Sequence, residues 1–468
     1  MTVHNLTLSQ AAVAYGGTLL FPDCQFSSVS TDSRTLSAGD LFVALRGESF
    51  DAHLFLKQAA IKAIGLVVQY PDKQIDIPQW VVPDTILALG QLAAMARQQF
   101  DGPLVALTGS SGKTTVKEML ASIFGCVAPV LATKGNLNNH IGVPQTLLAL
   151  EAEHRFAVLE LGASAPGEIA YLASLAKPTI AVVINVLPAH VEGFGSLAGV
   201  AAAKGEIYRS LDASGTAVLN LDEPWSAQWQ KTLPCLKTVT FSIDQSEADV
   251  YASDIRLDVD GCAAFNLHID GDKSLAQIPS ELPVQLHIPG RHNVSNALAA
   301  AACAMAAGIE ITTITAGLES VSAVAGRMEF KPGIKQSRVI DDSYNANPGS
   351  VKAAIDVLAV LQGRRILVLG DMAELGAEAD KLHRDVGKYA CQKGVDVLMA
   401  CGELCAYAVQ GFGADGQHFD DKAALIESLI AELSIGVTVL IKGSRSAAME
   451  EVVDQIVTVE NVTAGESI

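Results

Sequence analysis

The stretch Leu107-Thr108-Gly109-Ser110-Ser111-Gly112-Lys113-Thr114-Thr115 decides the fold class of this chain and predicts a nucleoside triphosphate as ligand. An apolar strand is expected just before it, over 103–107, and a helical pattern follows over 116–124. In such a strand–loop–helix context, backbone N–H groups and a helix N-terminus hold phosphates, a lysine reaches the β- and γ-phosphates, and a threonine hydroxyl binds Mg²⁺. The loop is shorter than the common phosphate loop, because Leu107 stands where that loop has glycine. A chance Gly-Lys-Thr in a surface turn is the alternative, and both flanking segments argue against it.

Composition is typical of a compact α/β enzyme with several domains. The 468 residues correspond to about three domains, and half of the residues are hydrophobic. A net charge of −19 argues against nonspecific binding to nucleic acid, which needs lysine and arginine to neutralise phosphates. The first residues do not resemble a secretory signal, and the longest apolar run, 297–309, is shorter than the ~20 residues that span a bilayer. We therefore expect a cytoplasmic protein without an integral membrane segment, and a monomer.

The eight cysteines show no framework of disulfides or zinc ligands. Only Cys401 and Cys405 form a close pair, and no second pair completes a zinc site. Reduced thiols are the expected state.

The pattern of strands and helices divides the chain into three predicted domains. Residues 1–84 form a small α/β cap with one amphipathic helix at 53–63. Residues 85–326 contain continuous apolar strands between helices, which indicates a parallel sheet covered on both faces, and an Asp-Gly turn that predicts an antiparallel hairpin inserted over 254–268. Residues 327–468 repeat the strand–helix alternation and predict a doubly wound, Rossmann-like domain. The expected strands are 40–45, 65–69, 79–82, 103–107, 155–160, 179–185, 215–220, 338–341, 365–369, 395–400 and 437–441.

Two polar residues follow strands of the central domain. Glu160 ends one strand, and His190 lies shortly after another. Ligands of open α/β sheets gather outside the carboxyl ends of the strands, so both side chains are expected near the phosphate loop. Each alone is more often structural, but together they predict a divalent metal site.

Lys204 lies among alanines in Val200-Ala-Ala-Ala-Lys-Gly-Glu-Ile207. A lysine buried near a metal would lose its proton, since desolvation and nearby cations disfavour the ammonium. The neutral amine can take up CO₂ to form an anionic carbamate, which is able to bind a metal. The alternative is an ordinary lysine on a helix surface.

Seven motifs occur in the order seen in the Mur ligases, which this chain resembles along essentially its whole length. Those motifs are 108–115, Glu160, 189–196, 204–206, 290–296, 326–327 and 341–348. Ser30-Thr-Asp-Ser-Arg34, Gly135-Asn-Leu-Asn-Asn139, 342–348 and Gly370-Asp-Met-Ala-Glu-Leu-Gly376 are most similar to the branch that adds a dipeptide. The resemblance implies an ATP-dependent ligase that joins D-alanyl-D-alanine to UDP-N-acetylmuramoyl-tripeptide through an acyl phosphate, in peptidoglycan precursor synthesis.

The resemblance also implies roles for individual residues. The ATP site would comprise Gly109, Ser110, Ser111, Gly112, Lys113, Thr114, Thr115, Asn296, Arg327, Asp342 and Asn345. Two Mg²⁺ ions would be held by Thr114 and Glu160, and by His190 and a carbamylated Lys204. Catalysis would rest on Lys113, His190, Lys204 and Arg327. The UDP part of the substrate would contact Ser30, Asp32, Ser33, Arg34, Arg46 and His53.

One departure and one open assignment concern the ends of the chain. Ala52 stands where the family usually has glycine before the histidine, which puts the local loop geometry in question. Lys442, Ser444 and Arg445 lie where a strand passes into a helix and could hold the carboxylate of the incoming dipeptide. An ordinary strand–helix turn is the alternative.

Other enzymes and another class of protein are the rival interpretations. A Mur ligase that adds a diamino acid would carry an Asp-Asn-Pro-Arg run, which this sequence lacks. A folylpolyglutamate synthase would not need the N-terminal cap. A P-loop ATPase switch would hydrolyse ATP without an amine acceptor.

Overall fold

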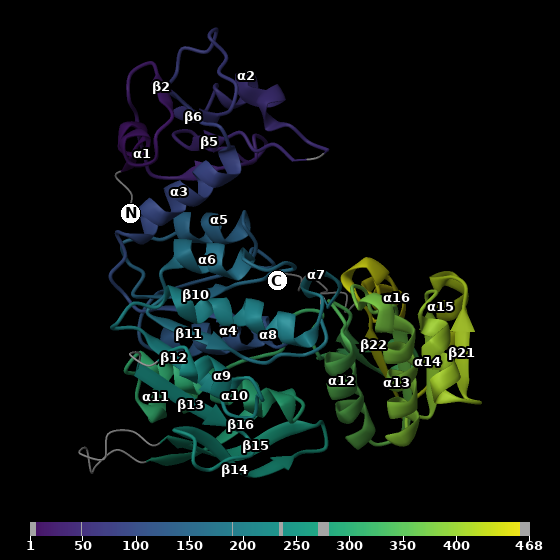
Figure 1. Cartoon of the computed structure of the whole chain (residues 1–468). Coiled ribbons are helices and arrows are strands. Elements are labelled where there is room, and N and C mark those ends of the chain that lie inside the picture. The colour runs from purple at the N-terminus through teal and green to yellow at the C-terminus, as the bar shows by residue number, and fades with distance from the viewer. Residues whose placement is uncertain (1–5, 48, 190, 234–236, 270–279, 459–468) are drawn as a thin grey trace, which may run out of the picture.

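The computed structural model describes residues 6–47, 49–189, 191–233, 237–269 and 280–458. Three large sheets follow one another along the chain, each covered by helices (Figure 1). The predicted fold class is confirmed: a small α/β cap, a central parallel sheet with an antiparallel extension, and a Rossmann-like C-terminal sheet.

The N-terminal sheet has five strands in the order β2-β7-β6-β5-β4, of which only β2 is antiparallel to its neighbour. Its elements, with a separate pair β1 and β3, are β1 (Leu6–Thr7), α1 (Leu8–Tyr15), β2 (Thr18–Leu20), β3 (Gln25–Phe26), β4 (Val29–Ser30), β5 (Leu41–Val43), α2 (Leu56–Ala59), β6 (Gly65–Val68) and β7 (Gln79–Val81). The helix expected at 53–63 is shorter: a 3-10 turn at Ala52–Phe55 continues into α2. Ala52 begins that turn without a positive φ, so this conformation does not require glycine there.

The central sheet has nine strands in the order β16-β15-β14-β13-β12-β11-β8-β10-β9. The strands are β8 (Leu104–Thr108), β9 (Val130–Ala132), β10 (Phe156–Glu160), β11 (Ile180–Val183), β12 (Thr216–Asn220), β13 (Lys237–Ser242), β14 (Val250–Leu257), β15 (Cys262–Ile269) and β16 (Glu281–Pro289). Strands β8 to β13 are parallel, and β14, β15 and β16 pair antiparallel, which confirms the predicted inserted hairpin.

Helices cover both faces of the central sheet, because successive apolar residues of each strand point to opposite sides. Leu107 packs with α4 (Lys113–Gly125), α10 (His292–Ala306) and α11 (Ile311–Glu319). Ala106 packs on the other face, whose core continues through α3 (Thr85–Arg97) into the N-terminal sheet. The remaining central helices are α5 (Gly142–Leu148), α6 (Glu168–Ala176), α7 (Val191–Phe194), α8 (Leu197–Gly205) and α9 (Ser226–Lys231).

The apolar run expected to form one buried helix over 297–309 belongs to α10, which ends at Ala306. Most of its side chains from Asn293 to Ala304 are buried. Within the described residues, none of the helices has the length and apolar character needed to cross a bilayer.

The C-terminal sheet has six strands in the order β17-β18-β22-β19-β20-β21, all parallel except β17. Helices α12, α13 and α14 cover one face, and α15 and α16 cover the other. The elements are β17 (Glu329–Pro332), β18 (Arg338–Asp342), α12 (Pro348–Val360), β19 (Arg364–Gly370), α13 (Ala379–Gln392), β20 (Val397–Cys401), α14 (Cys405–Phe412), β21 (Gly416–Phe419), α15 (Lys422–Glu432), β22 (Val437–Lys442) and α16 (Glu450–Ile456). The edge strands β17 and β21 were not predicted, because neither carries a run of apolar residues.

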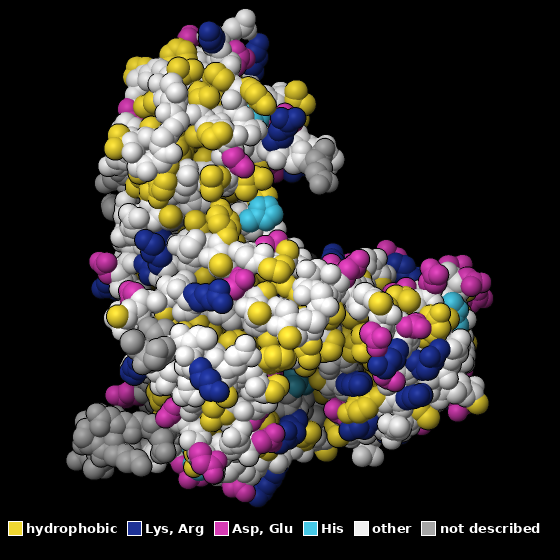
Figure 2. Space-filling model, viewed as in Figure 1, with side chains coloured by type: hydrophobic (Ala, Val, Ile, Leu, Met, Phe, Trp, Pro, Cys, Tyr) yellow, Lys and Arg dark blue, Asp and Glu magenta, His cyan; other side chains and the backbone are white. Residues whose placement is uncertain are grey.

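Figure 2 shows a broad hollow between the N-terminal part, which rises above the central sheet, and the C-terminal part beside it.

Candidate active site

The phosphate loop has the conformation that its sequence predicts. It joins β8 to α4, and Gly112 has a φ of +80° at the start of the helix. A side chain at Gly112 would collide with Asn296, because a Cβ there would lie 2.5 Å from Oδ1 of that residue. The Lys113 Nζ donates to the Gly109 carbonyl at 2.9 Å. The loop is therefore shaped around an open space in front of α4.

Asn185, just after β11, holds the phosphate loop in place and was not assigned a role from the sequence. Its Oδ1 accepts the Ser111 N–H at 2.9 Å, and its Nδ2 donates to the Ser111 carbonyl at 3.1 Å. The Asn185 carbonyl accepts the Ser110 N–H at 3.1 Å. Its place at the carboxyl end of a central strand was the available signal.

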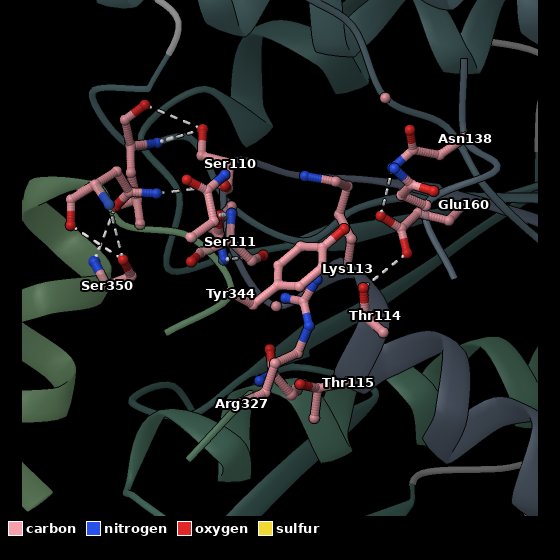
Figure 3. A pocket seen from close by; sticks show the side chains of 18 of the residues that line it. Ser110, Ser111, Lys113, Thr114, Thr115, Asn138, Glu160, Arg327, Tyr344 and Ser350 are labelled. Carbon is pink, nitrogen blue, oxygen red and sulfur yellow. Dashed lines mark hydrogen bonds between the residues drawn. The ribbon is translucent and has the colours of Figure 1, made fainter. Parts of the chain in front are cut away.

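Glu160 is buried at the end of β10 and is held from several sides. Its Oε2 accepts the Thr114 hydroxyl at 3.0 Å, and its Oε1 accepts Asn138 Nδ2 at 2.9 Å (Figure 3). The Glu160 N–H donates to the Thr133 hydroxyl oxygen at 3.0 Å. A carboxylate and a hydroxyl oxygen side by side are the hard ligands that Mg²⁺ prefers, so these residues fit a magnesium ion. Asn138 belongs to the 135–139 motif, and its contact with Glu160 was not predicted.

Lys204 is 3 % exposed in α8, so the alternative of a helix-surface lysine is wrong. Burial, and after it the charge of Lys113, lowers its pKa well below the usual value. No carboxylate lies within ion-pair distance of its ammonium among the residues that the structure describes. A buried lysine without an acid partner fits conversion to a carbamate, because the neutral amine is the reactive form. His190 lies outside the described residues.

Glu206 fastens the segment that carries Lys204 to the neighbouring helix α6. Its carboxylate accepts the N–H groups of Gly167 and Ala170 at the start of α6, at 3.0 and 3.1 Å. Gly205 is required by a close approach, since a Cβ there would lie 2.5 Å from the Trp229 ring nitrogen.

A cavity of about 930 Å³ connects these groups with the C-terminal domain. Its lining includes the following residues of the predicted ATP and metal sites: Ser110, Ser111, Gly112, Lys113, Thr114, Thr115, Glu160, Lys204, Asn296, Arg327, Asp342 and Asn345. Residues more than 200 positions apart thus face one space. Burial, and to a smaller extent the Arg327 charge, lowers the pKa of Lys113, and the Glu160 carboxylate acts in the opposite direction.

The three residues considered for the dipeptide carboxylate are not placed alike. The Lys442 ammonium is buried in this cavity and contacts the Asp342 Oδ2 at 2.5 Å and the Asn345 carbonyl at 2.8 Å. Ser444 and Arg445 are not among the residues that line it, and Arg445 is paired with Glu450 at 2.7 Å. The acceptor role of this set stays a prediction.

The residues predicted for the UDP group lie at the end of β4 and after β4 and β5, which are neighbouring parallel strands. The Arg34 guanidinium is 2.7 Å from Asp32, and it holds the pKa of that carboxyl at about 2. His53 Nδ1 lies 2.7 Å from Asp51, which is 3.8 Å from Arg46. Ser30 and Ser33 belong to the first of these two segments, which the carboxyl ends of adjacent strands bring to one edge.

Asp371, His383 and Cys405 form a second cluster of potential ligands in the C-terminal domain. The fold already uses these atoms: Asp371 Oδ1 accepts the Cys405 N–H at 2.8 Å, and His383 Nε2 accepts the Met372 N–H at 2.9 Å. The other His383 nitrogen contacts the Ala379 carbonyl at 2.7 Å, so the ring has no nitrogen left for a metal.

A phosphate loop, a buried carboxylate and a buried lysine that share a cavity with a second α/β domain define a nucleotide-dependent enzyme with a site between domains. Residues 107–304 match the Mur ligase middle domain, and residues 326–445 match the Mur ligase, glutamate ligase domain. This chain belongs to the Mur ligase family.

Individual relatives are similar along nearly their whole length. The UDP-N-acetylmuramoyl-tripeptide–D-alanyl-D-alanine ligase of Escherichia coli strain K12 is 47% identical over 96% of this chain and 98% of its own. The enzyme of the same name from Bacillus subtilis is 34% identical, over 96% and 98%. A crystal structure of MurF from Acinetobacter baumannii has a TM-score of 0.88 at 37% identity, over 95% and 97%. MurF ligase from Thermotoga maritima in complex with ADP has a TM-score of 0.80 at 26% identity, over 92% and 96%.

Proposed function

We propose that this protein is an ATP-dependent ligase that joins D-alanyl-D-alanine to UDP-N-acetylmuramoyl-tripeptide, with release of ADP and phosphate. The observation that carries the proposal is the single cavity in which Lys113, Glu160 and Lys204 meet Arg327 and Asp342. Relatives that carry this activity in their names align with 96% of the chain. Synthesis of a cytoplasmic precursor of peptidoglycan is the process that this reaction would serve.

The chemistry requires that a carboxylate be activated before an amine can attack it. The terminal carboxylate of the tripeptide attacks the γ-phosphate of ATP, which gives an acyl phosphate and ADP. The amine of the dipeptide then attacks the acyl carbon, phosphate leaves, and the amide bond is formed. Two anions approach each other in the first step, so positioning and positive charge are the main contributions of the protein.

Residues of two domains would supply that charge. Lys113 and the N–H groups of the loop would hold the β- and γ-phosphates, and Arg327 would neutralise charge that develops during transfer. Thr114 with Glu160, and His190 with a carbamylated Lys204, would hold two Mg²⁺ ions. When bound, those ions would neutralise the triphosphate and draw the substrate carboxylate toward it. Asn296 would face the adenine, and Asp342 would contact the ribose, with Asn345 close by.

The three predicted domains would divide the work. Residues 1–84 would bind the UDP group, 85–326 would bind ATP, and 327–468 would bind the dipeptide. Closure of the last domain over the second would exclude water from the acyl phosphate, which hydrolyses easily.

The test is phosphate release, with product mass, across a matrix of UDP-muramoyl-peptides and amine acceptors. We expect turnover with the tripeptide and D-alanyl-D-alanine, loss of turnover in Lys113→Ala, and wild-type turnover in the surface variant Lys388→Ala. Rapid product formation with a diamino acid, and none with the dipeptide, would assign the protein to another branch. ATP hydrolysis that no acceptor stimulates would indicate a switch.

A further inference from the structure

Arg327 is half-buried at the edge of the site, and its charge is not matched by an acid. Within the described part of the chain, no carboxylate lies within ion-pair distance of its guanidinium. The Tyr344 ring faces it instead, with the guanidinium carbon 4.2 Å from the ring centroid. Figure 3 shows the ring beside the Arg327 side chain in the pocket that contains Lys113 and Thr115.

Two acids on the strands that follow Arg327 are occupied elsewhere. Asp342 contacts the Lys442 ammonium, and Glu329 lies 3.1 Å from the Lys331 ammonium. Arg338, at the start of β18, offers a contrast: its guanidinium also lies over an aromatic ring, but it is ion-paired with Asp260. The arrangement at Arg327 therefore holds the arginine and leaves its charge unneutralised.

The backbone ties Arg327 to the loop that carries Tyr344. Gly326 and Met328, on either side of it, have φ values of +70° and +50°. The Tyr344 N–H donates to the Gly326 carbonyl at 3.1 Å, and the Met328 N–H donates to Asp342 Oδ1 at 3.2 Å. Arg327 is thus fastened to the end of β18 in the C-terminal sheet.

We propose that Tyr344 is a positioning residue that presents the Arg327 guanidinium to the phosphates of ATP. An aromatic ring attracts the flat face of a guanidinium and leaves the N–H groups along its edge free. A carboxylate would instead occupy two of those N–H groups and cancel the charge that the phosphates need. The proposal rests on the proposed function only in taking ATP as the nucleotide and Arg327 as its ligand.

The experiment is a double-mutant cycle on Tyr344 and Arg327. Affinity for ATP and ADP is measured by calorimetry without any acceptor, and kcat and KM for ATP are measured in ligation. We expect Tyr344→Leu to weaken ATP binding or raise KM by roughly 3- to 30-fold, the range of a partly desolvated cation–π contact. Tyr344→Phe, which keeps the ring, is expected to stay within about twofold of wild type. In an Arg327→Ala background, Tyr344→Leu should change affinity by less than about twofold.

Tyr407→Leu is the matched control, because Arg384 lies over the Tyr407 ring at 5.2 Å, and neither residue is among those lining the cavity. It should leave nucleotide affinity unchanged. An equal loss from Tyr344→Leu in both backgrounds would overturn the proposal, since the ring would then act on the nucleotide or on folding. A loss of ATP affinity in Tyr344→Phe as large as that in Tyr344→Leu would overturn it as well. If the wild type binds ATP but does not ligate the dipeptide, the proposed function fails while the cycle still decides this inference.

Discussion

The buried Lys442–Asp342 pair makes a sharp prediction about stability. Lys442 is 2 % exposed and Asp342 is 9 % exposed, and the ammonium contacts one carboxylate oxygen and the Asn345 carbonyl. Lys442→Met keeps the volume of the side chain but leaves the buried carboxylate without its cationic partner, with only the Met328 N–H still donating to it. Breaking a buried pair in this way costs about 3–5 kcal/mol. Replacing Asp342 with Asn in the same chain removes the orphaned charge, so the double variant should lose only about 1–2 kcal/mol.

Hydrogen exchange of the amides in β18 and β22 measures this loss in the domain concerned. We expect protection there to fall roughly 100- to 5,000-fold in Lys442→Met, as 1.4 kcal/mol is tenfold in an equilibrium constant. The tryptophans are Trp80, Trp225 and Trp229, all outside the C-terminal domain. The unfolding transition followed by tryptophan fluorescence should therefore move little in Lys442→Met.

Lys393→Met is the matched control, because the Lys393–Asp356 pair has side-chain exposures of 41% and 46%, and exposed pairs contribute about 0–1 kcal/mol. Unchanged protection in Lys442→Met, together with a raised KM for the dipeptide, would refute the structural reasoning. That result would assign Lys442 to acceptor binding.

Three further predictions concern the central domain. Lys204→Ala should abolish ligation, and short carboxylates should restore part of it. Wild-type activity should fall as pH falls through the lowered pKa of Lys204, because the protonated amine cannot take up CO₂. A loss that no carboxylate repairs, with an unmodified lysine in a crystal structure at neutral pH with nucleotide and Mg²⁺ bound, would contradict this. Gly112→Ala should lose at least tenfold in ATP affinity by calorimetry, since its Cβ would clash with Asn296 and its φ of +80° disfavours alanine; wild-type affinity would show that the loop relaxes freely. Burial raises the pKa of Glu223 to about 7, so the folded state binds an extra proton between about pH 5 and 7 and loses stability as pH rises. In Glu223→Gln, the free energy of unfolding, measured by urea and tryptophan fluorescence, should no longer fall between about pH 5 and 7. A variant with the same pH profile as the wild type would count against the shifted pKa.

Local sequence was sufficient where the relevant contacts are close along the chain. The phosphate loop is one continuous stretch, and its glycine, lysine and threonine are required by the turn and by the phosphates themselves. The strands on either side alternate between two buried faces, so their apolar runs predicted the parallel sheet. The Asp-Gly pair likewise predicted the β14–β15 hairpin, because Gly261 closes the short connection between the strands with a φ of +76°.

Contacts between distant segments were decided by the tertiary structure. Lys204 shows the difference, because a lysine among alanines reads the same on a buried and on an exposed helix, and only packing removes it from water. Lys442 and Asp342 are 100 residues apart, and they meet because β18 and β22 are neighbours in the sheet. Hydrophobic periodicity specifies which face of an element is buried, but it carries no information about which distant polar group will lie opposite. The chain alone therefore determined the loop that holds the phosphates, whereas the folded sheets determined which charges surround it.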